Sequence, residues 1–291
     1  MIIADKRTKL WLIASLFIIL LGGGILYSFW YRPSQPHRQT TRVVATTTAI
    51  TAIMAKLDVK LVAVPTTTQT LPQQYRKLPR VGNHVSINWQ NLLAAKPDVV
   101  YVDSELADEY QAKLKEQKIT MKALDLQTYP QMLKTIKYLG EKYGKQTAAK
   151  KLIAQLQIKT VHRKKHPRVL ILMGMPGGSF LAMNNKSYLG ELVEKAGGKV
   201  VGADPHSLYT SPNSEKIAQA NPQIVIRLAH AMPTEVEAAF KIAFQADPYN
   251  QLIAVKNHHV YDVKAPVFSP TANLQVNKAY SQIKEWVNQV E

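Results

Sequence analysis

The stretch LLAAKPDVVY at residues 92–101 has a counterpart later in the chain, IAQANPQIVI at residues 217–226. Each combines the end of an apolar helix, a turn at proline and a run of β-branched residues that is typical of a buried strand. An opening strand recurs in the same way, as RVVA from Arg42 and RVLIL from Arg168. The offset is 126 residues between the two arginines and 125 between the two prolines, so the repeat keeps its register. We therefore expect two α/β lobes built on one plan.

Hydrophobic periodicity predicts the strands and helices of each half. In the first half we expect strands at 42–45, 61–64 and 99–102, and helices at 49–57 and 87–95. In the second half we expect strands at 168–172, 199–201 and 224–226, and a helix at 188–195. Residues 145–165 combine helical apolar spacing with the absence of Gly and Pro, which predicts one long helix between a first lobe at 42–144 and a second lobe at 166–291. Such a connector predicts a cleft that hinges little.

An uncharged run of 22 residues, LWLIASLFIILLGGGILYSFWY at 10–31, precedes the lobes. It is long enough to cross a hydrocarbon core of about 30 Å as a helix, and the basic residues among 1–9 favour a cytoplasmic N-terminus. The stretch at 32–41 is then a linker, and the lobes lie on the extracellular face of the cell membrane. The alternative is a cleaved signal peptide, but the apolar run is longer than a signal-peptide core. We expect a retained anchor and, because the chain has no cysteine, no lipid attached to one.

The chain is strongly basic, with 37 Lys and Arg against 20 Asp and Glu and a formal charge of +17. Such a charge fits nucleic acid, an anionic membrane or an acidic cell envelope. The basic residues are scattered over helix faces and no nucleic-acid-binding motif accompanies them, so we expect no nucleic-acid partner. Nor do we expect an enzyme, because Gly174–Gly178 has neither dinucleotide nor P-loop spacing and no nucleophile elbow or zinc-protease motif occurs.

The expected ligand site lies between the lobes, since ligands of parallel α/β sheets bind at the carboxyl ends of the strands. The loops there are rich in hydroxyl and amide side chains and hold few carboxylates. Hydroxyl groups at helix N-termini can donate to an anionic ligand, although ordinary N-capping explains the same residues. The candidates for ligand contact are Thr47, Thr48, Thr67, Thr68, Val85, Lys186, Ser187, Tyr209 and Met232.

His230 is the strongest candidate for a metal ligand. It follows the apolar strand 224–228 at its carboxyl end, and its neighbours in the chain are apolar. His84 lies in the equivalent loop of the first lobe, so the two imidazoles can approach one ligand from opposite sides. A purely structural histidine is the alternative at each position.

Five stretches that occur in the same order along the chain carry a family resemblance. They are Pro65-Thr66 with Thr70-Leu71-Pro72, the strand 169–174, Lys186-Ser187-Tyr188, Arg227-Leu228 with His230, Met232 and Pro233, and Thr271-Ala272-Asn273. With them, the chain from Arg42 onward resembles the haem receptors of the iron-regulated surface determinant system of Gram-positive bacteria, in the helical-backbone class of solute-binding proteins. The resemblance implies two Rossmann-like lobes, haem as the transported ligand between them, and an axial iron ligand at His230. It also implies a monomer that delivers haem to an ABC permease and its ATPase for iron acquisition.

Three positions depart from that family. Its first-lobe methionine ligand falls on Val85, which has no donor atom for iron, and a lysine of its first-lobe loop falls on Gln69. His84 is adjacent to Val85, so we expect it as the second iron ligand, with five-coordinate iron as the alternative. Of the two acidic residues that the family presents to permease arginines, one falls on Glu215 and the other on Gln90, so one charged contact is lost.

Two other functions stay open at this point. The same fold serves receptors of other ligands, such as a ferric siderophore or a corrinoid, although siderophore sites typically use several Arg or Tyr residues that these loops lack. The second alternative is a membrane-anchored haem-handling protein that docks no permease.

Overall fold

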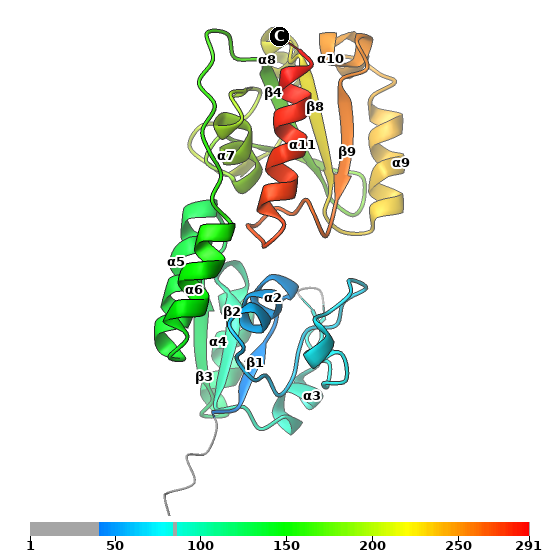
Figure 1. Ribbon diagram of the computed structural model, residues 1–291. Helices are drawn as coiled ribbons and strands as arrows, with labels where there is room; N and C mark the ends of the chain where they lie inside the picture. Colours follow the sequence, from blue (N-terminus) through cyan, green and yellow to red (C-terminus); the bar gives the residue numbers. More distant parts are fainter. Residues whose placement is uncertain (1–40, 84–85, 291) are drawn as a thin grey trace, which may run out of the picture. The chain divides into compact units, whose positions relative to one another are not determined.

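The first lobe is built on a parallel sheet. A computed structural model describes residues 41–83 and 86–290, and Thr41–Glu291 form one compact unit. In this part of the chain the strands β1 (Val43–Ala45), β2 (Val99–Asp103) and β3 (Thr120–Leu124) are parallel and lie in the order β1-β2-β3 (Figure 1). The surrounding helices are α2 (Thr48–Lys56), α3 (Trp89–Ala94) and α4 (Ala107–Glu116), with short 3-10 turns at Gln73–Tyr75 and Ser104–Leu106.

The second lobe has a larger, mixed sheet. Its described strands are β4 (Arg168–Gly174), β5 (Phe180–Met183), β6 (Lys199–Val200), β7 (Tyr209–Thr210), β8 (Ile224–Ala229) and β9 (Val260–Lys264). They lie in the order β7-β5-β4-β8-β9 with β6 also beside β4, and β5 and β7 are antiparallel to their neighbours. The helices are α7 (Tyr188–Lys195), α8 (Ser214–Ala220), α9 (Pro233–Ala243), α10 (Ile253–Lys256) and α11 (Val276–Asn288), with a 3-10 turn at Tyr249–Gln251.

Successive residues of β4 face two different helical layers. Val169 and Ile171 pack into the core that contains α7 and α11, whereas Leu170 and Leu172 pack against α8 and α9. A strand with both faces covered is apolar at successive positions, which explains the unbroken apolar run VLILM after Arg168.

The internal repeat is confirmed in the register of the two sheets. Val43 pairs with Val99 between β1 and β2, and Val169 pairs with Ile224 between β4 and β8. These pairs are related by the same offsets, 126 and 125 residues, as the sequence repeat. The two lobes therefore share one plan for their central parallel strands.

The repeat extends to an arginine that begins each lobe. Arg42 Nη2 donates to Ala95 O at 2.7 Å and its Nε donates to Lys96 O at 2.9 Å, at the C-terminal end of α3. Arg168 repeats these contacts at the end of α8, where its Nε donates to Ala220 O at 2.8 Å and its Nη2 to Asn221 O at 2.9 Å. Each guanidinium satisfies carbonyl groups that the end of a helix leaves without an N–H partner.

The strand expected at 61–64 is only partly formed. Val62 N donates to Val43 O, but Val64 N donates to Pro79 O on the other side. The structure therefore records isolated bridges of Ala63 with Val44 and of Val64 with Arg80, not a continuous ladder. The segment changes partner at its midpoint, and this shortens the strand.

The expected connecting helix over 145–165 is wrong in its second half. α5 (Tyr129–Lys142) is followed by α6 (Gln146–Gln155), and residues 157–167 are not helical. β-branched residues at 158, 160 and 161 disfavour a helix there. Tertiary hydrogen bonds also draw the backbone away: Val161 N donates to Lys195 O at 2.8 Å, and the Tyr280 hydroxyl donates to Lys159 O.

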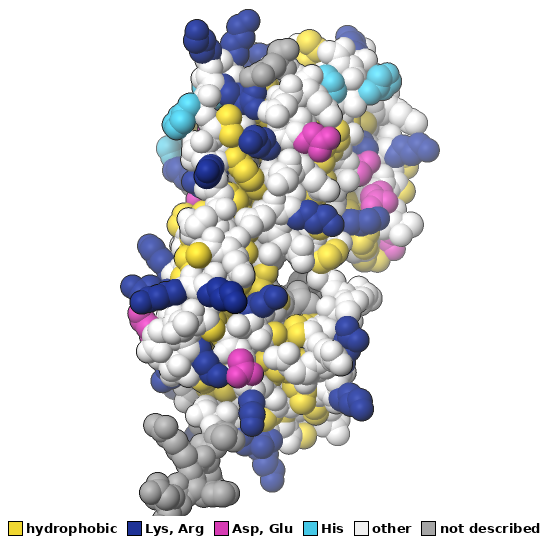
Figure 2. Space-filling model, viewed as in Figure 1, with side chains coloured by type: hydrophobic (Ala, Val, Ile, Leu, Met, Phe, Trp, Pro, Cys, Tyr) yellow, Lys and Arg dark blue, Asp and Glu magenta, His cyan; other side chains and the backbone are white. Residues whose placement is uncertain are grey.

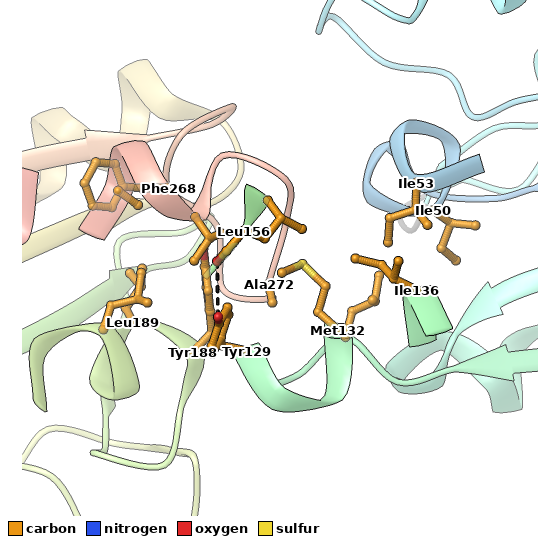
Figure 3. Packing of buried hydrophobic residues seen from close by; sticks show 14 of the residues in the cluster. Ile50, Ile53, Tyr129, Met132, Ile136, Leu156, Tyr188, Leu189, Phe268 and Ala272 are labelled. Atoms are coloured by element: carbon orange, nitrogen blue, oxygen red, sulfur yellow. Dashed lines mark hydrogen bonds between the residues drawn. The ribbon is translucent and has the colours of Figure 1, made fainter. Parts of the chain in front are cut away.

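One hydrophobic core runs through both lobes. It contains residues of α2, α5 and α6 together with residues of α7, α11 and the loop before α11. Figure 3 shows side chains from these elements, among them Ile53, Met132, Tyr129, Tyr188 and Ala272. Within the described residues, no helix combines the length and apolar character needed to cross a membrane. The expected anchor at 10–31 lies outside those residues and stays a prediction.

Candidate functional site

His230 lies where β8 gives way to α9. β8 ends at Ala229, His230 is half-buried, and Pro233 begins the helix. The turn between them places Met232 in the left-handed region, at φ 47°, with half of its side chain exposed (50%). An imidazole and a large thioether side chain thus occupy one tight turn at a strand's carboxyl end, where parallel α/β lobes bind their ligands.

The candidate hydroxyl residues are partly engaged as helix caps. Thr47 Oγ1 accepts a hydrogen bond from Ile50 N at 3.3 Å at the start of α2. Ser187, which is fully buried, accepts from Gly190 N at 3.2 Å and donates to Asn184 O at 2.6 Å. Thr67 Oγ1 accepts from Gln69 N at 3.0 Å. The capping alternative therefore holds for the hydroxyls of Thr47 and Ser187.

Three further candidates have half-buried or exposed side chains. Thr48 is half-buried in the first turn of α2, and Thr68 is exposed in the loop after Thr67. Lys186 is also exposed, and its backbone N–H donates to Asn184 Oδ1 at 2.9 Å, which fixes the loop before α7. Its ammonium group is a cation available to an anionic ligand at the edge of the second lobe.

Tyr209 of β7 lies near carboxylates of the first lobe. Its hydroxyl donates to Pro270 O at 3.2 Å. Burial, and to a smaller extent the negative charges of Glu105 and Asp103, raise the pKa of the Tyr209 hydroxyl to about 12. Asp103 is the last residue of β2 and Glu105 lies in the 3-10 turn that follows it, so the strand ends of the two lobes influence each other electrostatically here.

A carboxylate group at the ends of β2 and β3 was not expected from the sequence. Asp103, the last residue of β2, is only 5% exposed, and burial raises its pKa to about 6. A hydrogen bond from Glu105 N to Asp103 Oδ1 at 3.2 Å partly offsets this shift, while the charges of Glu105 and Asp125 add to it. The expectation of few carboxylates at the strand ends is therefore wrong for the first lobe. The signal was an aspartate that directly ends the apolar strand VVYVD.

Two hydrogen bonds join the lobes beside these strand ends. Tyr129 N, at the start of α5, donates to Glu191 Oε2 on α7 at 2.8 Å, and Ala272 N donates to Leu126 O at 2.7 Å. Burial raises the pKa of the Glu191 carboxyl, and the Tyr129 N–H and the Lys195 charge act in the opposite direction. Sequence reasoning singled out neither residue of the first pair.

The two candidate docking residues occupy equivalent positions. Gln90 follows the N-cap residue Asn88 of α3, and Glu215 follows the N-cap residue Asn213 of α8 by the same interval. Both side chains are exposed. The internal repeat thus presents one polar residue per lobe, of which Glu215 alone is charged.

His84 and Val85 lie outside the described residues, so the suggested second iron ligand stays a hypothesis. In the described part of the chain, no three His, Cys, Asp or Glu residues come together as a group that could hold a metal ion.

Two α/β lobes with a shared core and polar strand ends define a two-lobed solute-binding protein. Accordingly, the chain belongs to the periplasmic binding protein family, whose model matches residues 43–267. This membership confirms the expectation of a binding protein and not an enzyme.

Within this family, the chain is similar to individual proteins that bind heme or belong to ABC transporters. The chain is 38% identical over 250 residues to the high-affinity heme uptake system protein IsdE of Staphylococcus aureus (strain Newman), a match that covers 83% of this chain and 85% of that protein. The crystal structure of S. aureus IsdE complexed with heme matches with a TM-score of 0.78 and 37% identity, over 85% of this chain and 98% of that one. An ABC transporter substrate-binding protein from Listeria monocytogenes EGD-e matches with a TM-score of 0.79 and 35% identity, over 86% of this chain and 100% of that one. These matches confirm the resemblance inferred from the sequence.

Proposed function

We propose that this protein is an extracytoplasmic receptor that binds haem between its lobes and delivers it to an ABC importer. The observation that carries the proposal is His230, at the carboxyl end of a central strand, in a chain 38% identical to a haem uptake protein. Haem is the cargo of such a receptor, which releases it unchanged.

The chemistry of the turn at His230 suits a haem face. A neutral imidazole is a good ligand for haem iron, and Ala231 and Met232 supply apolar contacts for the porphyrin ring. Lys186 and the hydroxyl of Thr48 or Thr68 are donors for the two carboxylates of haem. His84 is the proposed ligand on the opposite side, because the neighbouring Val85 cannot bind iron.

Delivery requires a docking surface for a permease. The support for Glu215 and Gln90 in that role is their equivalent, exposed placement at the starts of α8 and α3. Charge-assisted contacts at Glu215 would orient the second lobe on a basic permease surface. On the visible face, Lys and Arg side chains are spread out and do not form one continuous stripe (Figure 2), which supports a protein partner over nucleic acid.

The proposed location is the cell membrane, with residues 1–9 in the cytoplasm, 10–31 as anchor and the lobes on the extracellular face. The uncharged run at 10–31 and the absence of cysteine support an anchor of protein, not lipid.

A binding assay tests the function directly. The purified full chain, titrated with haem, should develop a ligand-shifted Soret band and saturate at one haem per chain. Ferric siderophores and a corrinoid serve as competing ligands. Saturable binding of either competitor, without a Soret change on addition of haem, would overturn the proposal.

A further inference from the structure

A carboxylate of the second lobe binds the start of a first-lobe helix. Glu191, in the first turn of α7, accepts the 2.8 Å hydrogen bond from Tyr129 N. Tyr129 is the first residue of α5, so its N–H has no carbonyl partner within that helix. The N-cap residue Thr128 accepts from Gln131 N instead. Glu191 therefore provides, from the other lobe, the acceptor that Tyr129 N lacks in its own helix.

This hydrogen bond has the properties of a strong contact. Its acceptor is a carboxylate at a helix N-terminus, where the partial positive charge of the helix favours an anion. Tyr129 is only 5% exposed and Glu191 is half-buried, so water competes weakly for either group. Lys195 lies one turn further along α7, and its Nζ is 5.9 Å from the centre of the Tyr129 ring. A second side chain of α7 therefore contacts the first turn of α5.

The two helices joined by Glu191 both begin at the edge of the candidate site. α7 follows the loop that carries Lys186 and Ser187, and α5 follows the carboxyl end of β3 at Leu124. Figure 3 shows buried residues of α5 and α7, among them Tyr129 and Leu189, which belong to the same hydrophobic cluster. A bond at this point fixes a ligand-contacting loop of one lobe relative to the strand ends of the other.

We propose that Glu191 is a positioning residue, which sets the separation of the lobes and thereby slows the escape of the ligand. Apolar side chains in the shared core are non-directional and tolerate small sliding motions. Directed hydrogen bonds, such as Tyr129 N to Glu191 and Ala272 N to Leu126 O, do not, because their strength depends on distance and angle. The link to haem retention rests on the proposed function, whereas the control of lobe separation does not.

Lobe separation is measured without any ligand. The chain has no cysteine, so Lys115→Cys on α4 and Lys241→Cys on α9, both exposed, accept spin labels at two defined points. In the full chain in detergent, pulsed electron paramagnetic resonance gives the distribution of label distances. Glu191→Ala should broaden or shift this distribution, and Glu191→Gln, which keeps an acceptor oxygen, should stay close to the parent.

The matched control is Glu194→Ala on the same helix. Glu194 Oε1 accepts a 3.0 Å hydrogen bond from Val200 N within the second lobe, so this variant loses a comparable bond that does not join the lobes. It should leave the distance distribution unchanged. Haem loss to an excess of scavenging apoprotein should be about 3- to 10-fold faster in Glu191→Ala than in the parent or in Glu194→Ala.

The two readouts separate the two claims. An unchanged distance distribution in Glu191→Ala would overturn the positioning role, even if that variant lost haem faster. A parent chain that binds no haem would overturn the proposed function, while the distances would still decide the role of Glu191. Should Glu191→Ala fail to fold, a Glu191→Gln variant with parent-like distances and a Glu191→Lys variant with broadened distances would support the role, and equal distributions for both would refute it.

Discussion

Asp103 is a carboxyl group that the fold buries at a cost. Burial raises its pKa from 3.8 to about 6, so the folded protein holds this proton more tightly than the unfolded chain does. The stabilising effect of the protonated form is complete below pH 4 and is lost as the pH rises through about 6. Above that pH the protein carries a buried carboxylate that lowers its stability. Groups kept at such a cost often serve a ligand site.

Asp103→Asn should therefore stabilise the protein in a pH-dependent way. Asparagine keeps an oxygen that can accept from Glu105 N, but it has no charge to bury. We expect the free energy of unfolding to rise by roughly 1–2 kcal/mol at pH 7.5 and by little at pH 4. Urea unfolding at both pH values measures this difference. Asp108→Asn, on the exposed surface of α4, is the control, and an equal gain for Asp103→Asn at both pH values would contradict the account.

The location of an individual residue could be predicted from the sequence where its place in a strand or helix is sufficient to determine it. His230 was placed at a strand end because the apolar run before it defines that end. For Thr47 and Ser187 the sequence was compatible with either ligand contact or helix capping, and the hydrogen bonds of their side chains show that both cap helices. Asp103 and Glu191 were missed, since their burial depends on which elements of other parts of the chain cover them.

Arg42 and Arg168 make equivalent contacts in the two lobes, so we expect them to contribute similarly to the free energy of unfolding. Each guanidinium donates to carbonyls at the end of a helix, with Nη2 contacts of 2.7 Å and 2.9 Å. Arg42→Ala and Arg168→Ala should each lower the free energy of unfolding by about 1–2 kcal/mol. Arg42→Lys and Arg168→Lys keep the charge but lose the planar fork, so they should lose most of this stability as well. Lysine variants as stable as the parent in chemical unfolding would show that charge alone is sufficient.

The starts of α3 and α8 carry the proposed docking residues. Glu215→Ala removes the proposed charged contact to the permease and should lower haem-dependent uptake about tenfold or more. Gln90→Ala removes a neutral side chain at the equivalent position and should change uptake less than about twofold. Uptake by cells that express the partner importer measures both, with haem binding of each purified variant as the control. Equal uptake by the two variants would be evidence against this docking mode.

At the element scale, the helices and parallel strands with strong periodicity were predictable. α2, α7, β2 and β8 lie within one to three residues of their expected bounds. The helix over 145–165 and the strand at 61–64 were overestimated, because tertiary hydrogen bonds outcompete local pattern in both segments. The antiparallel strands β5 and β7 were not predicted, since both are short and have little periodicity of their own.

The whole molecule combines a two-lobed body with a separate N-terminal segment. The body belongs to the periplasmic binding protein family, and its two lobes share a continuous core. The sequence repeat alone predicted this two-lobed plan, because similar segments at nearly equal offsets are typical of two units that share the same order of strands and helices. The hydrogen bonds between the lobes could not be predicted, since they depend on how two independently patterned halves meet.

The N-terminal segment yields a prediction for the intact protein. We expect the uncharged run of 22 residues at 10–31 to hold the chain in a bilayer without a lipid, because it is long enough to cross the hydrocarbon core as a helix. We expect protein extracted from membranes to retain residues 1–31. Intact-mass spectrometry measures this, and a mass that lacks those residues would show that the segment is a cleaved signal peptide.

The absorption spectrum of haem bound to histidine variants tests most directly whether the protein binds haem through His230. His230→Ala should abolish haem binding or weaken it strongly, because we propose His230 as the principal iron ligand. With His84 as the second ligand, the parent should give a six-coordinate, low-spin spectrum that shifts in His84→Ala. His206→Ala, on an exposed loop of the second lobe, should leave the spectrum unchanged. A His230→Ala variant with the spectrum and haem affinity of the parent would contradict the account.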